Sequence, residues 1–295
     1  MGKDLAAAHP AAAGVFAAAD AALGFSLSAL CWNGTDDDLK ATAITQPSIL
    51  TVAVAAYAAF TERGGAPPVA AAGHSLGEYA AHVVAGTFPF DAAVATVRQR
   101  GQFMQEAVPA GEGAMAAILG LPRPQLAQAI ASAAHGEIVS LANINGPDQI
   151  VIAGHAGAVS RACTAALAAG AKRAVPLPVS APFHCALMEP AAVRLAAVLA
   201  RVTFCDPSIP VYTNADASAV RTASASRDAL VRQVASPVRW EEEVVRMADD
   251  GIDTFVEFGP GRVLAGLVRR IRKDARVLSV PDNAGLDAAL VALGS

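Results

Sequence analysis

The chain has 295 residues, of which 54% are apolar and only 16% are charged, and its formal net charge is −4. These proportions are typical of a globular protein with a large core and exclude a disordered chain. Without an excess of basic residues there is no positive field to hold nucleic acid, so we expect no nucleic-acid partner.

Cysteine spacing and hydropathy exclude further classes of protein. The four cysteines lie far apart, with no CxxC pair that would indicate zinc, so we predict no metal site. Polar residues interrupt every long apolar run, so we expect no membrane span and no membrane partner. No secretory leader is evident, and we therefore expect a cytoplasmic protein with reduced thiols.

The first sixty residues are predicted to be helical. An alanine-rich helix over 11–23 ends at Gly24. A longer apolar helix is predicted over 48–60, with Pro47 at its start, because proline at a first helical turn loses no hydrogen bond.

A strand, a tight turn and a helix are predicted next. Residues 69–72 are short and apolar, 73–77 read Gly-His-Ser-Leu-Gly, and 78–85 have a helical pattern. This order fits G-x-S-x-G, in which a serine on a sharp turn exposes its hydroxyl as a nucleophile. It also fits a glycine-rich turn whose serine merely caps the helix. Another helix is predicted over 91–105.

Residues 112–180 have a different pattern of strands and helices and are predicted to form a small subdomain. Strands are predicted over 114–119, 138–143, 149–153 and 173–179, and helices over 122–134 and 156–169. The order β-α-β-β-α-β is that of the ferredoxin-like motif. We therefore predict a core of residues 1–111 and 181–295 that carries residues 112–180 as an insertion.

The remaining chain alternates strands with helices. Strands are predicted over 211–213 and 254–258, and helices over 188–200, 227–234, 240–248 and 263–271. Such alternation implies an α/β core with a parallel sheet and helices on both of its faces.

A nucleophilic Ser75 needs a base, and six histidines are available. His184 lies in a proline-containing loop where the chain re-enters the core, a position suited to a base beside a cleft. His74 adjoins Ser75, but neighbours on a tight turn usually point apart. Spacing alone does not bring His184 to Ser75. The other histidines suit packed or solvated positions: His9, His82, His135 and His155.

Several stretches of the chain carry a family resemblance: TQPSILT, AGHSLGEYAA, RGQFMQEAVP, GAMAAILGL, NGPDQIVIAG, AKRAVPLPVS, APFHCALM, ALVRQ, SPVRW and EFGPGRVLAGL. Together, and in this order, they resemble the malonyl-CoA:acyl carrier protein transacylase family over nearly the whole chain. The resemblance implies an α/β-hydrolase-like core with an inserted ferredoxin-like subdomain, which the patterns above also predict.

The resemblance implies a Ser–His pair. Ser75 would carry the acyl group and His184 would act as its base. In this family a main-chain carbonyl, not a carboxylate, orients the imidazole, and Gln233 matches the residue that supplies it. The Leu76 N–H at the helix N-terminus is expected to stabilise the oxyanion.

Arg100 matches the family arginine that binds the malonyl carboxylate, a strong and directional pair. Helical periodicity does not separate it from Arg98. In relatives, an aromatic residue at the position of Phe183 goes with malonyl rather than methylmalonyl groups, although core packing also explains it. His74 and Asn143 are further candidates near the acyl group, and hairpin-turn geometry explains Asn143 at least as well.

The front of the sequence departs from the family. Relatives begin with a strand and a GQGSQ-type loop, and only then reach the stretch that resembles residues 1–5. In the family a glutamine of this loop supplies the second oxyanion donor. We therefore expect the true start to lie upstream of Met1.

The reaction implied by the resemblance is ping-pong transfer of malonyl from malonyl-CoA to the phosphopantetheine thiol of acyl carrier protein. We expect no cofactor and a monomer. Lys172 and Arg173 match a basic stretch that could receive the acidic carrier, although ordinary surface charge explains each of them. The alternatives are a serine esterase or thioesterase, a malonyl-loading acyltransferase of a polyketide-type pathway, and a non-catalytic remnant.

Overall fold

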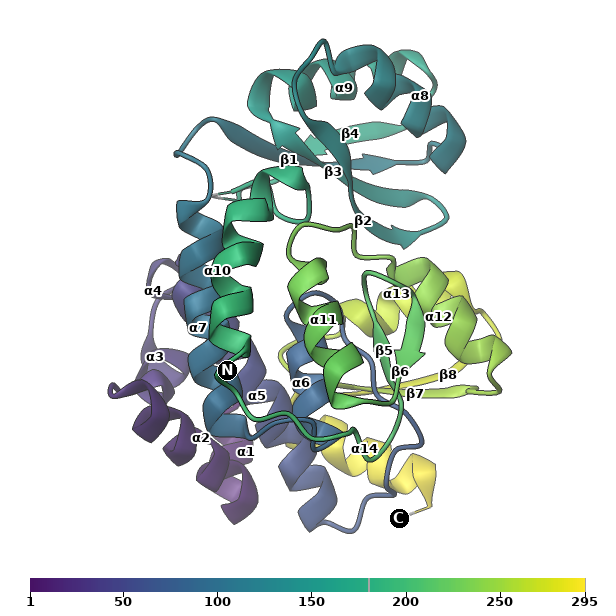
Figure 1. The fold of residues 1–295 in the computed structure, drawn as a ribbon. Helices are drawn as coiled ribbons and strands as arrows, with labels where there is room; N and C mark the ends of the chain where they lie inside the picture. The colour runs from purple at the N-terminus through teal and green to yellow at the C-terminus, as the bar shows by residue number, and fades with distance from the viewer. Residues whose placement is uncertain (180, 295) are drawn as a thin grey trace.

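The computed structural model describes residues 1–179 and 181–294, and its elements form two groups (Figure 1). An antiparallel sheet with two helices lies at one end, at the top of Figure 1, and the other elements lie below it. The division into residues 1–111 with 181–295 and residues 112–180 stays a prediction. Its second boundary falls on Ser180, which lies outside the described residues.

The group at the top contains four strands: β1 (Gly113–Leu119), β2 (Val139–Gly146), β3 (Gln149–His155) and β4 (Arg173–Pro176). They are ordered β2-β3-β1-β4, with α8 (Arg123–Ala133) after β1 and α9 (Ala156–Ala168) after β3. This confirms the predicted β-α-β-β-α-β order and its ferredoxin-like arrangement. β4 ends at Pro176 rather than at 179. Side chains from the sheet and both helices, including Ile152, Leu126 and Val159, share one buried cluster.

The first sixty residues are helical, as predicted. The helices are α1 (Lys3–Ala8), α2 (Pro10–Leu23), α3 (Leu27–Asn33), α4 (Asp36–Lys40) and α5 (Thr42–Glu62).

The predicted start of the long apolar helix is wrong. α5 begins at Thr42, so Pro47 lies inside it and not at its first turn. The additional residues pack closely against α7 (Phe90–Glu106). Gly101 of α7 permits this approach, because a Cβ at its position would lie only 2.6 Å from the Thr42 carbonyl oxygen. The longer helix buries Gln46 against Met104 of α7.

Most of the remaining helices lie around short strands, whereas α10 (Glu189–Leu199) lies along α7 (Figure 1). The remaining helices are α6 (Gly77–Val84), the short 3-10 helix η1 (Ala186–Met188), α10, α11 (Ala223–Gln233), α12 (Trp240–Asp249), α13 (Val263–Ile271) and α14 (Asn283–Leu293).

Parallel pairing is present in the lower group, as predicted. β7 (Thr254–Phe258) pairs in parallel with β8 (Arg276–Val280), and Ala71 pairs in parallel with Val211. Val211 begins β5 (Val211–Thr213), which also pairs antiparallel with β6 (Ser218–Val220). Residues 69–72 form a bridge at Ala71 and not the predicted strand. β6, β8 and α14 were not predicted.

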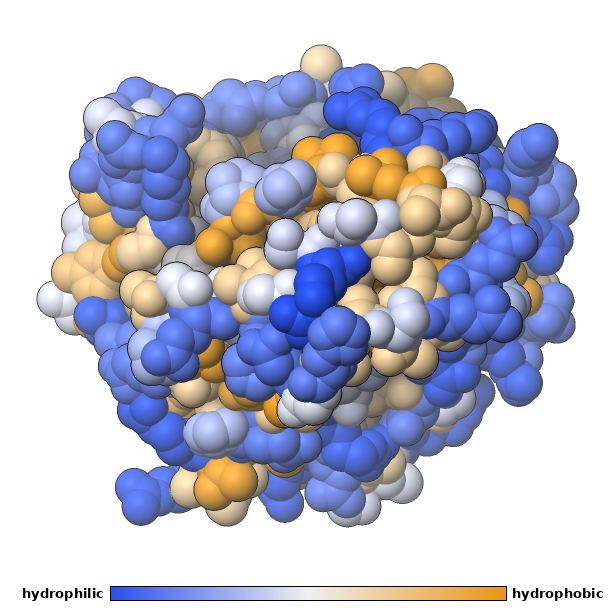
Figure 2. Space-filling model, turned by 90° about the horizontal axis from the view of Figure 1, so that it is seen from above, coloured by the Kyte–Doolittle hydropathy of each residue, from blue (hydrophilic) through white to orange (hydrophobic). Residues whose placement is uncertain are grey.

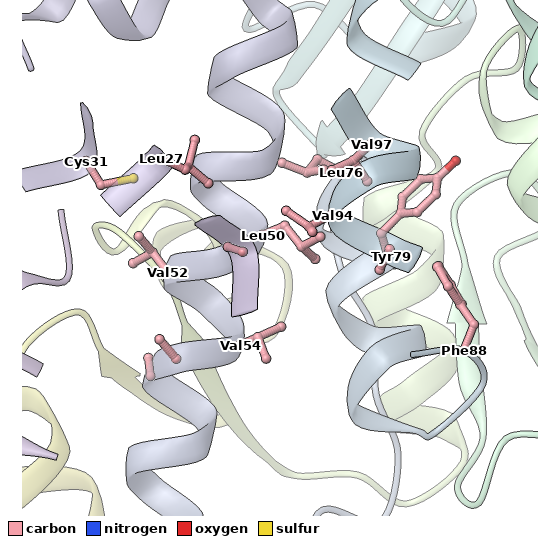
Figure 3. Close-up of a cluster of buried hydrophobic side chains, with 14 of the residues drawn as sticks. Leu27, Cys31, Leu50, Val52, Val54, Leu76, Tyr79, Phe88, Val94 and Val97 are labelled. Carbon is pink, nitrogen blue, oxygen red and sulfur yellow. The ribbon is translucent and has the colours of Figure 1, made fainter. Parts of the chain in front are cut away.

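The main core lies between α5, α6 and α7. Leu50 of α5 packs in one buried cluster with Tyr79 of α6 and with Val94 and Val97 of α7. Leu76, just before α6, lies beside Val97 in the same cluster (Figure 3). The turn that precedes α6 is therefore anchored to the core by its own side chain.

α5 is long and apolar enough to cross a membrane, a feature that the sequence analysis did not identify. In the structure 61% of its apolar window is buried inside the molecule. On the face of the molecule shown in Figure 2, hydrophobic and hydrophilic residues are interspersed.

Candidate active site

Ser75 lies on the turn between the bridge at Ala71 and the start of α6. Its φ of 51° is in the left-handed region, which a residue other than glycine rarely occupies. Gly73 makes this turn possible, because a Cβ there would lie 2.1 Å from the backbone of Gly77. The turn thus has the sharp geometry that exposes a nucleophilic serine.

The structure brings His184 to Ser75, although 109 positions separate them in the chain. Ser75 Oγ lies 2.7 Å from His184 Nε2, and His184 Nδ1 lies 2.9 Å from the carbonyl oxygen of Gln233. A proton on Nδ1 that is donated to this carbonyl leaves Nε2 as the acceptor for the Ser75 hydroxyl. His184 also has a positive φ, 60°. Both members of the pair therefore sit on strained backbone, which is a feature of functional sites.

The imidazole of His184 is poised to accept a proton. Burial, together with the nearby charges of Arg100 and His74, lowers the pKa of His184 to about 3, although its hydrogen bond to the Gln233 carbonyl acts in the opposite direction. The ring is therefore neutral near pH 7, which is the state that a general base requires.

Arg100 approaches the same serine from α7, where it is only 2% exposed. Its Nη2 donates to Ser75 Oγ at 3.2 Å and to Gln233 Oε1 at 2.9 Å, and its Nη1 donates to Gln46 Oε1 at 2.7 Å. The guanidinium carbon also lies 5.4 Å from the centre of the Tyr79 ring.

No ion pair within residues 1–179 and 181–294 includes Arg100. Neutral groups therefore hold a buried cation next to the hydroxyl, an arrangement that suits an anionic substrate group.

Leu76 and Phe183 flank the Ser–His pair. Among the described residues, nothing accepts a hydrogen bond from the Leu76 N–H, which is thus available at the N-terminus of α6 to meet an oxyanion. Phe183 is half-buried and packs against both the main core and the buried cluster that includes Cys185.

His74 connects the site to β2 of the antiparallel sheet, the strand that also carries Asn143. His74 Nε2 lies 2.8 Å from Oδ1 of Asn145 on β2, and burial lowers the pKa of His74. Asn143 is buried on the same strand and forms a parallel bridge with Val238. The turn that carries Ser75 is thereby linked to β2 through a partly buried contact of the His74 side chain.

The sequence analysis missed Gln46, Asn214 and Glu78. Gln46 holds Arg100, Asn214 Oδ1 accepts the Ser75 N–H at 2.6 Å, and Glu78 Oε2 accepts from both Asn214 and Gln233. Two predicted strands point to Asn214 only once they are known to pair. Asn214 follows β5, and Ser75 follows the segment around Ala71 that pairs with β5 in parallel. Parallel strands end at a common edge, so the residues that follow them lie close together. Gln46 has no comparable signal, since threonine, serine and glutamate residues also interrupt the apolar sequence of α5.

The arrangement can perform nucleophilic acyl transfer. A serine hydroxyl contacts a neutral imidazole, an N–H is available for the oxyanion, and a buried guanidinium lies beside the hydroxyl. In the described part of the chain, no group of three or more His, Cys, Asp and Glu residues could hold a metal ion.

Comparison with known proteins gives one consistent family. The acyl transferase domain family matches residues 1–286. The malonyl CoA-acyl carrier protein transacylase of Escherichia coli strain K12 is 50% identical over 290 residues, which are 98% of this chain and 94% of that protein. The protein of the same name from Bacillus subtilis strain 168 is 44% identical over 294 residues, which are 99% of this chain and 92% of that protein.

Solved structures agree with the sequence relatives. The malonyl CoA-acyl carrier protein transacylase of Coxiella burnetii superposes on this chain with a TM-score of 0.97 at 42% sequence identity. The superposition covers all of this chain and 93% of the Coxiella burnetii chain. A malonyl-transacylase solved in complex with a type II PKS acyl-carrier protein gives a TM-score of 0.96 at 47% sequence identity. This superposition covers 99% of this chain and 94% of the chain in that complex.

Proposed function

This chain belongs to the acyl transferase domain family, and we propose that it transfers the malonyl group of malonyl-CoA to the phosphopantetheine thiol of acyl carrier protein in fatty acid biosynthesis. The names of its relatives support this substrate pair. The observation that carries the proposal is the contact of one serine hydroxyl with both a neutral imidazole and a buried guanidinium.

The first half of the reaction forms a malonyl-serine ester. His184 Nε2 takes the proton of Ser75, and Oγ attacks the thioester carbonyl carbon of malonyl-CoA. The Leu76 N–H stabilises the resulting oxyanion. The carbon–sulfur bond then breaks, and coenzyme A leaves as a thiol with the proton from His184. The Gln233 carbonyl keeps the imidazole in the required tautomer throughout.

The second half returns the enzyme to its starting state. His184 takes the proton of the phosphopantetheine thiol, and the sulfur attacks the ester carbonyl of malonyl-Ser75. The bond from the carbonyl carbon to Oγ breaks, and Oγ recovers its proton from His184. Acyl groups move between oxygen and sulfur without oxidation or reduction, so the reaction needs no cofactor.

Arg100 selects the acyl group. A malonyl carboxylate that pairs with the guanidinium would replace contacts that Arg100 now makes with Ser75 and the amide of Gln233. An acetyl group would offer no such partner. We assign Phe183 to limiting the space for a branch beside the carbonyl, and His74 and Asn143 to the wall that faces the acyl group.

A malonyl-loading acyltransferase of a polyketide-type pathway is the second candidate. The structural relative in complex with a type II PKS carrier favours it. Both functions share the chemistry of Ser75 and differ in the carrier that receives the malonyl group. We expect a cytoplasmic monomer in either case.

The test is transfer of malonyl to a purified holo-carrier protein, followed by the intact mass of the carrier. We expect a fatty-acid-type carrier to gain one malonyl group faster than a polyketide-type carrier. Free malonate with no gain on any carrier would instead identify a thioesterase and would contradict the proposal.

A further inference from the structure

A cluster of fully buried polar side chains lies next to the backbone of Ser75. Its members come from three elements and from the end of β5: Glu78 of α6, Asn214 after β5, Gln233 of α11 and Glu243 of α12. Each of them is 0% exposed. Burial of this many polar groups is unfavourable unless they hydrogen-bond one another, so their contacts define a fixed geometry.

Two of these side chains hold the backbone of the nucleophile from both directions. The Ser75 N–H donates to Asn214 Oδ1 at 2.6 Å. The Ser75 carbonyl accepts from Gln233 Nε2 at 2.8 Å. The N–H of the residue that carries the reactive hydroxyl is thus bound by a buried side chain. Its C=O is bound by a second buried side chain and also accepts from the Glu78 N–H of α6 at 3.2 Å.

The orientation of the Asn214 amide is determined by its other contacts. Its Nδ2 donates to the Gly73 carbonyl at 2.8 Å and to Glu243 Oε2 at 2.9 Å. Its backbone N–H donates to Glu78 Oε2 at 2.9 Å. Because both partners of Nδ2 are acceptors, the amide oxygen faces the Ser75 N–H and also accepts from Gln233 Nε2 at 3.3 Å. A flipped amide would lose all four side-chain contacts.

We propose that Asn214 is a positioning residue that holds Ser75 in its left-handed conformation, so that Oγ stays between His184 Nε2 and Arg100 Nη2. The proposal rests on the acyl-transfer function given above. A serine with φ near 51° is unfavourable by itself. Without the Asn214 acceptor the turn can relax to negative φ, which moves Oγ away from its 2.7 Å contact with the imidazole.

The first test compares Asn214→Ala with Thr213→Val by quenched acylation of Ser75 with malonyl-CoA. Thr213 is the buried neighbour on β5, and its hydroxyl contacts the Ser218 carbonyl and not the site. We expect Asn214→Ala to lower the acylation rate constant about 10- to 100-fold, the effect of misplacing a reacting atom, with little change in the half-saturating malonyl-CoA concentration. Thr213→Val should acylate at the wild-type rate.

A second test reverses the polarity of one hydrogen bond. Asn214→Asp keeps an acceptor for the Ser75 N–H but removes the donor to the Gly73 carbonyl and to Glu243, and it places a third carboxyl group beside Glu78 and Glu243. Adding Glu243→Gln restores a donor, now from position 243 to position 214. We expect Asn214→Asp to be slow and the double variant to regain at least about tenfold in acylation rate.

The outcomes separate this inference from the proposed function. Acylation of wild-type Ser75 together with an Asn214→Ala rate equal to that of Thr213→Val would overturn the positioning role alone. If Asn214→Ala does not fold, a double variant no faster than Asn214→Asp would overturn it instead. Absence of any acylation in the wild type would contradict the proposed function itself.

Discussion

Arg100 is the residue that we propose selects the acyl group. Replacing it with alanine removes the cation that a malonyl carboxylate would meet. We expect Arg100→Ala to slow acylation by malonyl-CoA at least about 30-fold, the effect of losing about 2 kcal/mol from a buried charge pair. Acylation by acetyl-CoA should be unchanged or faster. Quenched mass spectrometry of the Ser75 peptide with each donor measures both rates.

Arg98→Ala is the matched control for this change. Arg98 lies on the same helix but stacks on the Phe25 ring, with its guanidinium carbon 4.9 Å from the ring centre. The control should keep the malonyl rate near that of the wild type. Equal losses of malonyl and acetyl rates in Arg100→Ala would show that the guanidinium supports the site and does not recognise the carboxylate.

The low pKa of His184 predicts an unusual pH profile. With a pKa of about 3 the imidazole stays neutral down to pH 5, so the acylation rate constant should change less than about twofold between pH 7.5 and 5. An imidazole at its ordinary pKa near 6.5 would instead lose about 30-fold over that range. Stopped-flow acylation across this range distinguishes the two.

The charge on Arg100 is one cause of the low pKa of His184, so removing this charge should raise that pKa. In Arg100→Ala, assayed with acetyl-CoA, the acid limb should move to higher pH, because protonation of His184 no longer faces a nearby cation. An acid limb that stays fixed or moves to lower pH would contradict the assigned cause.

At the scale of elements, the contact between α5 and α7 fixes the substrate-binding side chains. Gly101 follows Arg100 directly, and a Cβ on it would lie 2.6 Å from the Thr42 oxygen. We expect Gly101→Ala to destabilise the fold by about 1–3 kcal/mol despite alanine's better helix propensity, and to raise the half-saturating malonyl-CoA concentration. Urea unfolding and acylation kinetics measure the two effects.

Gly14 supplies the control for this helix substitution. It lies within α2, and a Cβ there would meet nothing within 4 Å. Gly14→Ala should therefore stabilise the protein by about 0.5–1 kcal/mol without changing acylation. A stabilising Gly101→Ala would show that α7 can move away from α5 at no cost.

The elements differ in how far sequence could predict them. Helices with a clear apolar periodicity, such as α13, were predicted at their observed bounds. The start of α5 is mispredicted, because Pro47 indicates a first helical turn, whereas the helix extends to Thr42, which packs closely against Gly101. β6 gives no strand signal, because Ser-Ala-Val contains a single β-branched residue, whereas the equally short β5, Val-Tyr-Thr, is wholly β-branched or aromatic and is predicted.

At the scale of the whole molecule, buried and exposed contacts join the antiparallel sheet and its helices to the rest. Asn145 contacts His74 in the interior, whereas Arg123 of α8 pairs with Glu242 of α12 at the surface. We expect Asn145→Ala to lower the free energy of unfolding by about 1–3 kcal/mol and to slow acylation, because His74 adjoins Ser75.

Arg123→Ala is the comparison for this prediction. Its exposed ion pair should contribute less than about 1 kcal/mol, and its loss should leave acylation unchanged. Urea unfolding of the two variants side by side gives the result. A larger loss of stability in Arg123→Ala than in Asn145→Ala would show that the surface contact, and not the buried one, joins the two groups of elements.

The candidate site was predictable in part. The G-x-S-x-G turn pointed to Ser75 from local pattern alone, whereas His184, Gln233 and Arg100 were assigned by family resemblance, because their approach to Ser75 depends on tertiary packing. Asn214 was missed for the same reason. Its role follows from the parallel pairing of Ala71 with Val211, which no local pattern reveals.

The most direct test of the central claim is the mass of the Ser75 peptide after brief incubation with malonyl-CoA and an acid quench. We expect one malonyl group on this peptide in the wild type, lost again on addition of holo-carrier protein, and none in Ser75→Ala. A malonyl group on another residue, or none on a folded wild-type protein, would contradict it.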